Sequence, residues 1–156
     1  LIAWSDTGKT TYLENLIPAL KKRGVRVAVI KHDGHDFDID HEGTDSDRFT
    51  RAGADVSGIF SDSHAAILLN GHIEAEKLIF LISMSGTADL IITEGCKKGK
   101  WPKILLYRES SGKPMAADPD TCAAVVSDVQ VQTSAPVFPL DDPDALAEYL
   151  TGSMLL

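Results

Sequence analysis

A short loop near the start of the chain constrains the fold more than any other feature. It reads, in order, Ala3-Trp4-Ser5-Asp6-Thr7-Gly8-Lys9-Thr10. This order satisfies the relaxed pattern of a phosphate-binding P-loop, in which a small residue and four arbitrary positions precede Gly-Lys and a hydroxyl residue. An apolar stretch at 1–3 comes before the loop and an amphipathic helical pattern follows at 10–23. Strand, loop and helix form the context that a P-loop requires, which makes a chance match to an ordinary turn the weaker alternative.

The loop residues have distinct predicted roles. Backbone N–H groups of the loop and of the first helical turn point inward, and the helix dipole favours an anion there. Lys9 is predicted to reach the terminal phosphates of a nucleotide, and the Thr10 hydroxyl to coordinate Mg²⁺. A carboxylate at Asp6 would repel the phosphates if it faced them, whereas one turned to solvent would have little effect. Nucleotide contacts are expected from Ser5, Asp6, Thr7, Gly8, Lys9, Thr10 and Thr11.

The rest of the sequence alternates between strand and helix patterns. Strands are predicted at 25–30, 56–60, 65–69, 89–93, 104–107, 123–126 and 137–138, and helices at 10–23, 46–52, 73–84 and 143–150. This alternation predicts an α/β fold of the P-loop NTPase type, a mostly parallel sheet flanked by helices in three layers. With 156 residues, the chain suits a single nucleotide-binding domain over 1–156, with 33–70 as a candidate β-ribbon or switch insertion. Because the chain opens inside a strand pattern, residues are expected before Leu1.

Two acidic residues at strand ends are candidate metal ligands. Glu94 ends a hydrophobic strand, at the sheet edge where ligands bind in α/β proteins. Asp33 follows the strand at 25–30 in a similar way. Both carboxylates are candidate Mg²⁺ ligands together with Thr10, and both are candidate catalytic residues together with Lys9. The alternative for each is a solvated loop carboxylate.

Three further features have more than one interpretation. The segment 32–41 supplies imidazoles and carboxylates, but its alternation of Asp with Phe37 and Ile39 favours an edge ribbon over a zinc site. A nucleotide-responsive switch or a contact with a partner is the favoured role. The lysines at 97, 98 and 100 could contact an anionic substrate or a partner, or form a solvated loop. Asp128 follows a predicted strand and is a candidate for reading guanine, with an ordinary turn residue as the alternative.

The acidic composition limits the partners. The formal net charge is −8 at pH 7. Binding to nucleic acid or to an anionic membrane without specificity needs a basic surface, so neither partner is expected. No apolar run approaches the about 20 residues of a membrane span. Cys96 and Cys122 lie far apart and indicate neither a disulfide framework nor paired zinc ligands, so a cytoplasmic protein is expected.

Together, the motifs resemble the molybdopterin-guanine dinucleotide biosynthesis protein B family, a small branch of P-loop GTPases. They span residues 1 to about 108, and the segment from Lys31 to Asp33 with the downstream Asp/Phe/Asp run is more specific than the P-loop itself. The match comprises Ser5 to Thr11, Leu16 to Leu20, Val27 to Asp33, His35 to Asp40, Asp45-Ser46 before Arg48, Arg51 to Ala54, Thr93-Glu94-Gly95 with Lys97, and Pro102-Lys103-Ile104.

The resemblance implies a cytoplasmic homodimer that binds GTP with Mg²⁺ and hydrolyses it slowly at most. It implies further that this protein assists the guanylyltransferase that attaches GMP to molybdenum cofactor. By the same resemblance, Gly8, Lys9, Thr10 and Thr11 are phosphate and metal positions, while His32, Asp33 and Glu94 lie near the γ-phosphate. The sequence departs from the glycines usual in the family at Ala3 and Asp6. This departure bears on hydrolysis more than on fold or pathway.

Two other functions remain open at the level of sequence. One is a small P-loop kinase of a nucleotide or cofactor, because such enzymes also use Gly-Lys-Thr-Thr, although the chain lacks an arginine-rich lid segment. The other is a non-catalytic adaptor whose altered P-loop binds a phosphate group, such as that of molybdopterin, and whose acidic surface docks a partner. Nucleotide preference and phosphoryl transfer distinguish these functions from a GTP-binding accessory protein.

Overall fold

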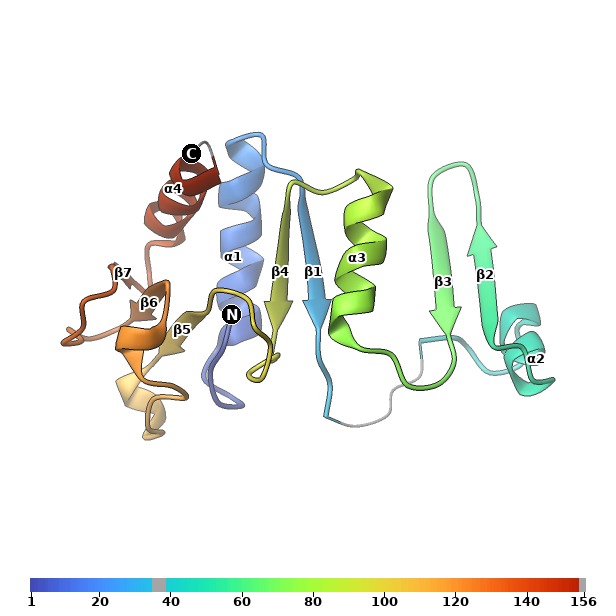
Figure 1. Cartoon of the computed structure of the whole chain (residues 1–156), viewed down its shortest axis with the longest axis horizontal. Coiled ribbons are helices and arrows are strands. Elements are labelled where there is room, and N and C mark those ends of the chain that lie inside the picture. The colour runs from blue at the N-terminus through green and yellow to red at the C-terminus, as the bar shows by residue number, and fades with distance from the viewer. Residues whose placement is uncertain (35–38, 155–156) are drawn as a thin grey trace. The chain divides into compact units, whose positions relative to one another are not determined.

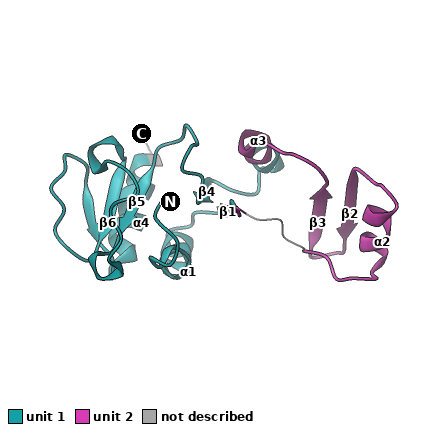
Figure 2. Ribbon diagram, turned by 90° about the horizontal axis from the view of Figure 1, so that it is seen from below, with its two compact units in different colours: residues 1–32, 81–156 teal, residues 33–80 magenta. Residues whose placement is uncertain are grey.

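The computed structural model describes residues 1–34 and 39–154, and the chain divides into two compact units. The first contains residues 1–32 and 81–156, and the second contains residues 33–80 (Figure 2). Helix α3 (Ala75–Ser85) runs across the boundary in sequence. The second unit includes the segment predicted as an insertion, while a single nucleotide-binding domain over the whole chain stays a prediction.

Parallel strands form the sheet of the first unit (Figure 1). β1 (Val27–Lys31) pairs with β4 (Leu90–Glu94), and β6 (Ala124–Ser127) pairs with both β5 (Ile104–Tyr107) and β7 (Val137–Pro139). These two groups are joined by the start of the chain. The Leu1 nitrogen donates to the Thr93 carbonyl oxygen at 2.6 Å, and the Ile2 nitrogen donates to the Ile104 carbonyl oxygen at 2.9 Å. Hydrogen bonds therefore connect β1, β4, residues 1–3, β5, β6 and β7 in that order.

Two helices cover one face of this sheet. α1 (Lys9–Lys22) and α4 (Pro143–Met154) pack against each other, and the Arg23 guanidinium meets the Asp144 carboxylate at 2.7 Å. The apolar side chains of α1 recur at three- and four-residue spacing, which places them on the side that faces the sheet and α4. The shared core contains Tyr12, Leu13, Leu16, Leu20, Leu106, Ala124, Val126, Leu146 and Ala147.

The opposite face of β5 and β6 is covered mainly by loops. Leu105 and Val125 are fully buried there, packed against side chains of the segments 115–122 and 131–135. The short 3-10 helices η1 (Glu109–Ser111) and η2 (Pro119–Thr121) lie in the chain between β5 and β6. The predicted α/β class is confirmed, and at this part of the sheet loops with 3-10 turns take the place of a long helix.

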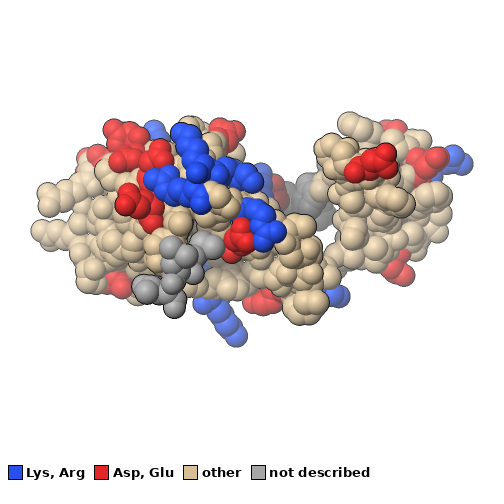
Figure 3. Space-filling model, turned by 90° about the horizontal axis from the view of Figure 1, so that it is seen from above, with Lys and Arg blue, Asp and Glu red and all other residues tan. Residues whose placement is uncertain are grey.

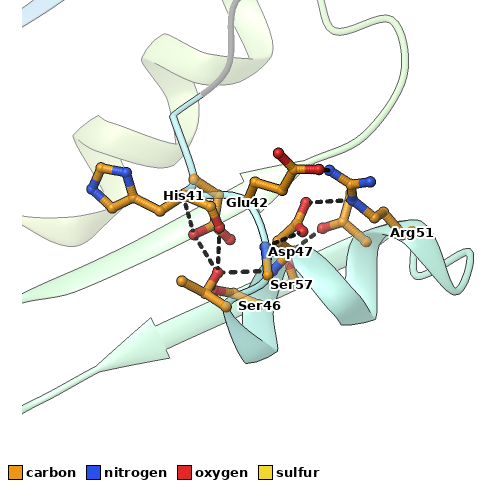
Figure 4. Close-up of polar contacts among 10 residues, drawn as sticks. His41, Glu42, Ser46, Asp47, Arg51 and Ser57 are labelled. Carbon is orange, nitrogen blue, oxygen red and sulfur yellow. Dashed lines mark hydrogen bonds and ion pairs between the residues drawn. The ribbon is translucent and has the colours of Figure 1, made fainter.

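The second unit contains an antiparallel hairpin and a short helix. β2 (Val56–Phe60) pairs with β3 (Ala65–Leu69), as the sequence predicted. α2 (Asp45–Arg51) begins at Thr44, whose hydroxyl accepts the Asp47 N–H and so caps the helix. Figure 4 shows the polar contacts around α2, in which the Asp47 carboxylate accepts from the Gly43 N–H at 2.8 Å and from the Arg51 guanidinium at 2.9 Å. These contacts fix the start of α2 to its own last turn.

Basic side chains gather at the end of α1, away from the P-loop. Lys21 and Lys22 lie in its last turn, where cations complement the negative end of the helix dipole. In the space-filling view from this side, lysine and arginine side chains cluster on the first unit with acidic side chains around them (Figure 3). Within residues 1–34 and 39–154, no helix has the length and apolar character needed to cross a membrane.

An ion pair joins the starts of the two strands β1 and β4. The Asp89 carboxylate accepts hydrogen bonds from the backbone N–H of Arg26 at 2.8 Å and from its guanidinium Nε at 3.0 Å. These hydrogen bonds, first of all the side-chain one, lower the pKa of Asp89 from its ordinary value of 3.8 to about 2. Since the folded state holds the ionised carboxylate, the pair stabilises the fold above the ordinary pKa and loses this contribution as the pH falls through 3.8 toward about 2.

Replacing this carboxylate is expected to give a stability loss that depends on pH. At about pH 6, Asp89→Asn should melt at a lower temperature than the wild type, and the difference should shrink as the pH falls through 3.8 and vanish only below about 2. Thermal denaturation followed by circular dichroism over this range measures the effect. The control is Asp62→Asn in the exposed hairpin turn. A melting difference for Asp89→Asn that stays constant with pH would contradict the conclusion that the ionised Asp89 carboxylate stabilises the fold through Arg26.

Candidate functional site

The P-loop lies at the carboxyl ends of the parallel strands, where the arrowheads of β1 and β4 point in Figure 1. Its backbone reverses through two residues in the left-handed region, Asp6 with φ 58° and Gly8 with φ 89°. Glycine adopts this conformation without strain, which is one reason for a glycine at position 8. The close approach of a neighbouring side chain is a second reason. A Cβ atom at that position would lie 3.1 Å from Nη2 of Arg108.

The Asp6 carboxylate is turned toward solvent. Its side chain is 92% exposed, and Oδ2 lies 3.8 Å from Nζ of Lys113. Lys113 also donates a hydrogen bond to the Ser5 carbonyl oxygen, so its ammonium group lies against the loop. An exposed carboxylate beside a lysine repels a bound phosphate only weakly, because solvent screens the interaction. The departure from glycine at Asp6 is therefore compatible with phosphate binding.

Cationic side chains surround the loop. Lys9 Nζ donates to the Trp4 carbonyl oxygen at 2.9 Å, and the buried Thr7 hydroxyl donates to the same oxygen at 2.7 Å. Lys97 Nζ lies 3.8 Å from the centroid of the Trp4 ring. Burial lowers the pKa of Lys9, the Glu94 carboxylate opposes this shift, and Lys97 and Lys113 add to it. The ammonium groups of Lys9, Lys97 and Lys113 therefore lie around one loop of an otherwise acidic chain. Such a local concentration of positive charge favours the binding of an anion at this loop.

Glu94 and Thr10 lie together at the end of β4. The Thr10 hydroxyl donates to Oε1 of Glu94 at 3.3 Å, and the Glu94 side chain is only 8% exposed. The backbone of β1 fixes this position, because the His32 N–H donates to the Glu94 carbonyl oxygen at 2.9 Å. A hydroxyl and a buried carboxylate are the hard oxygen ligands that Mg²⁺ prefers. The structure thus brings together two of the predicted metal ligands.

The remaining predicted site residues lie elsewhere or keep untested roles. Asp33 belongs to the second compact unit, so its contact with metal or γ-phosphate stays a prediction. Asp128 accepts hydrogen bonds from the Glu109 N–H at 2.8 Å and from the Ser110 hydroxyl at 3.3 Å, which lower its pKa. Its predicted role in reading guanine stays a prediction as well. Of the segment considered for zinc, residues 35–38 lie outside the described residues.

Among the residues that the structure describes, no group of three or more His, Cys, Asp or Glu side chains is arranged to hold a metal ion. Cys96 and Cys122 are both free thiols. A larger cavity, of about 1090 Å³, is lined by second-unit residues that include Asp33, Arg51 and Asn70. It contains no P-loop residue.

Sequence reasoning missed two cations near the loop, Arg108 and Lys113. Arg108 directly follows β5, so its place at the carboxyl end of a strand was a usable signal. Lys113 gave no such signal, because it lies in a loop after η1 and reaches the P-loop only through the tertiary structure. The sequence pointed to the lysines at 97–100 instead, of which Lys97 does contact the loop through Trp4.

The sheet order and the loop at its carboxyl edge define an α/β protein of the P-loop class. The family model for Molybdopterin guanine dinucleotide synthesis protein B, MobB, matches residues 1–128. The chain belongs to this family, and the resemblance found in the sequence is confirmed.

Known relatives agree with this assignment. The chain is 39% identical to the molybdopterin-guanine dinucleotide biosynthesis adapter protein of Escherichia coli, over 97% of this chain and 90% of that protein. It is 32% identical to the protein of the same name from Haemophilus influenzae, over 96% and 85% of the two chains. The crystal structure of Bacillus subtilis MobB has the same fold, with a TM-score of 0.75 and 24% identity, covering 96% of this chain and 93% of that one.

Proposed function

We propose that this protein is a GTP-binding adapter in the synthesis of molybdopterin guanine dinucleotide. The observation that carries the proposal is the pairing of Thr10 with the buried carboxylate of Glu94, directly beside Lys9 and the P-loop. The names of the curated relatives, which are adapter proteins of this synthesis, support the pathway. The acidic net charge fits a protein that works on other proteins and small anions rather than on nucleic acid.

Different residues of the chain bind different parts of the nucleotide and its metal ion. Backbone N–H groups from Ser5 to Thr11 surround the phosphates, and the dipole of α1 favours their charge. Lys9 leaves the Trp4 carbonyl oxygen, which it contacts here at 2.9 Å, and pairs with the terminal phosphates. Thr10 and Glu94 hold Mg²⁺, which neutralises phosphate charge when it is bound. Hydrolysis is slow at most, and Asp33 and His32 are the proposed residues near the γ-phosphate.

The proposal includes a cytoplasmic homodimer that assists the guanylyltransferase of the same synthesis. An apolar surface on the hairpin supports a protein partner, because large exposed apolar patches mark interaction sites. Phe60 is 86% exposed and Ile67 is 71% exposed. Association of the guanylyltransferase with the protein should strengthen when GTP is present, which a pull-down with and without GTP measures. Association that ignores both GTP and a Lys9→Ala substitution would favour a non-catalytic adaptor.

Removing the charge of Glu94 is expected to abolish the contribution of Mg²⁺ to GTP binding. The wild type should bind GTP about tenfold more tightly with Mg²⁺ than with a chelator, and Glu94→Gln should bind about equally under both conditions. Isothermal titration calorimetry with GTP measures both affinities. The matched control is Glu148→Gln, an exposed carboxylate on α4. An unchanged Mg²⁺ effect in Glu94→Gln would remove this residue from the metal site.

A further inference from the structure

A small cavity lies beside the P-loop within the first unit. Its volume is about 320 Å³, which is in the range of sites for small ligands. Its walls come from the first turns of α1, from the residue after β5, from the segment between β7 and α4, and from the first residue of α4. The lining residues are Thr11, Tyr12, Asn15, Arg108, Leu140, Asp141 and Pro143. Thr11 belongs both to this lining and to the predicted phosphate contacts.

Arg108 connects the cavity with the P-loop. Its guanidinium packs so closely on Gly8 that a Cβ there would lie 3.1 Å from Nη2 and 3.6 Å from Cζ. Among the described residues, Arg108 has no carboxylate partner, and its buried Nε has no hydrogen-bond partner. A half-buried guanidinium usually meets an anion, since it carries five donors and a permanent charge. The structure therefore leaves a cation beside the phosphate loop ready for an external anion.

The backbone around Arg108 is held in place by its neighbours. The Asp128 carboxylate accepts the Glu109 N–H at 2.8 Å, and the Ser111 hydroxyl donates to the Arg108 carbonyl oxygen at 2.7 Å. These bonds fix the turn that follows β5. The guanidinium is thus presented by an ordered backbone, which favours binding because little conformational freedom is lost.

The two sides of the P-loop give the direction of a bound nucleotide. The loop follows residues 1–3, which lie between β4 and β5 in the sheet. Thr10 and Glu94 mark the β4 side as the end for metal and terminal phosphate. The cavity with Arg108 lies on the β5 side. A nucleotide whose terminal phosphate lies near Glu94 would place its nucleoside toward this cavity.

The walls of the cavity fit a purine base that offers hydrogen-bond donors. Tyr12, Leu140 and Pro143 supply apolar surface, as most ligand sites do for flat rings. The Asp141 carboxylate only accepts hydrogen bonds. Guanine presents N1–H and the 2-amino group side by side, and a carboxylate can accept from both. Adenine presents one amino donor beside an acceptor nitrogen, which a carboxylate repels.

We propose that this cavity is the nucleoside subsite, in which Arg108 binds the phosphate next to the ribose and Asp141 recognises guanine. The proposal rests on GTP binding by the P-loop, as proposed for this protein. It adds the side from which the nucleoside enters and the residue that selects the base: Asp141 takes the role predicted for Asp128, whose carboxylate already accepts from the Glu109 N–H and the Ser110 hydroxyl.

The test compares four ligands in the presence of Mg²⁺: GTP, ITP, ATP and inorganic tripolyphosphate. ITP lacks the 2-amino group of guanine, and tripolyphosphate lacks the nucleoside. Calorimetry should show that Asp141→Asn weakens GTP binding about tenfold, removes the preference for GTP over ITP and leaves tripolyphosphate unchanged. Arg108→Gln should weaken GTP and tripolyphosphate alike, about tenfold, and Arg108→Lys should weaken them less. Melting curves of each variant report whether it folds.

The matched controls are Glu148→Gln for Asp141 and Glu109→Gln for Arg108, since both carboxylates are exposed and lie outside the lining of the cavity. GTP binding that requires Lys9 but is unchanged in the Asp141 and Arg108 variants overturns the subsite and leaves the proposed function standing. Equal affinity of the wild type for GTP and ATP overturns the role of Asp141. Absence of GTP binding by the wild type overturns the proposed function and the subsite together.

Discussion

Replacing Lys9 with alanine is expected to weaken GTP binding about 100-fold while the fold stays intact. The ammonium group lies beside the loop, and among the described residues it donates its hydrogen bond to the Trp4 carbonyl oxygen at 2.9 Å. Its loss removes charge-assisted hydrogen bonds to the terminal phosphates and takes nothing from the core. Calorimetric titration with GTP and Mg²⁺ measures the change, and thermal melting without nucleotide checks the fold.

Lys22→Ala is the control for this variant, because Lys22 is an exposed lysine in the last turn of α1, at the opposite end of the helix from the P-loop. It should bind GTP within about twofold of the wild type, since a distant, exposed charge is screened by salt. Equal GTP affinities of Lys9→Ala and the wild type would count against the P-loop as the nucleotide site. Loss of affinity in both lysine variants would point to net charge rather than to a defined contact.

The largest effect on stability is expected from Leu16→Ala, with a decrease of about 3 kcal/mol in the free energy of unfolding. Leu16 is 1% exposed and lies in the core that α1 shares with the sheet and α4. Truncation removes buried apolar surface and leaves a cavity that the surrounding helices and strands fill only in part. Urea denaturation followed by circular dichroism measures the change, which corresponds to roughly 10 °C in the melting temperature.

The control Glu14→Ala distinguishes the loss of core packing in Leu16→Ala from an effect of alanine on helix propensity. Glu14 is exposed on the same helix, and alanine favours helix at least as well as glutamate does. This variant should stay within about 0.5 kcal/mol of the wild type. A loss in Leu16→Ala no larger than in Glu14→Ala would contradict the placement of Leu16 in the core.

Local patterns in the sequence were enough to locate most of the elements. The strands β2, β3 and β5 have the predicted bounds, since β-branched and apolar runs between turn residues carry their own signal. Helix α1 was predicted at 10–23 and lies at Lys9–Lys22, and α4 extends past the predicted end at 150 to Met154. Helix ends move by a few residues because capping and packing, rather than propensity, decide the last turn.

The pairing of residues 1–3 with other strands could not be predicted from the local sequence pattern. Residues 1–3 were predicted as the end of a buried strand, and they carry the hydrogen bonds that join β4 to β5, although Ile2 forms only an isolated bridge with Leu105. Their role as the connection between two groups of strands depends on segments about 90 to 100 residues away along the chain, which no local pattern encodes.

The amino-acid sequence was enough to assign the family, the α/β class and the P-loop motif, because each rests on short contiguous patterns such as Gly8-Lys9-Thr10. It also determined Glu94 as a candidate metal ligand, since a carboxylate that ends a buried strand lies at the ligand edge of a parallel sheet. The solvent-facing carboxylate of Asp6 and the packing of Arg108 on Gly8 became visible in the three-dimensional structure. Both depend on the direction of side chains and on contacts between distant segments, which the packing of the whole sheet sets.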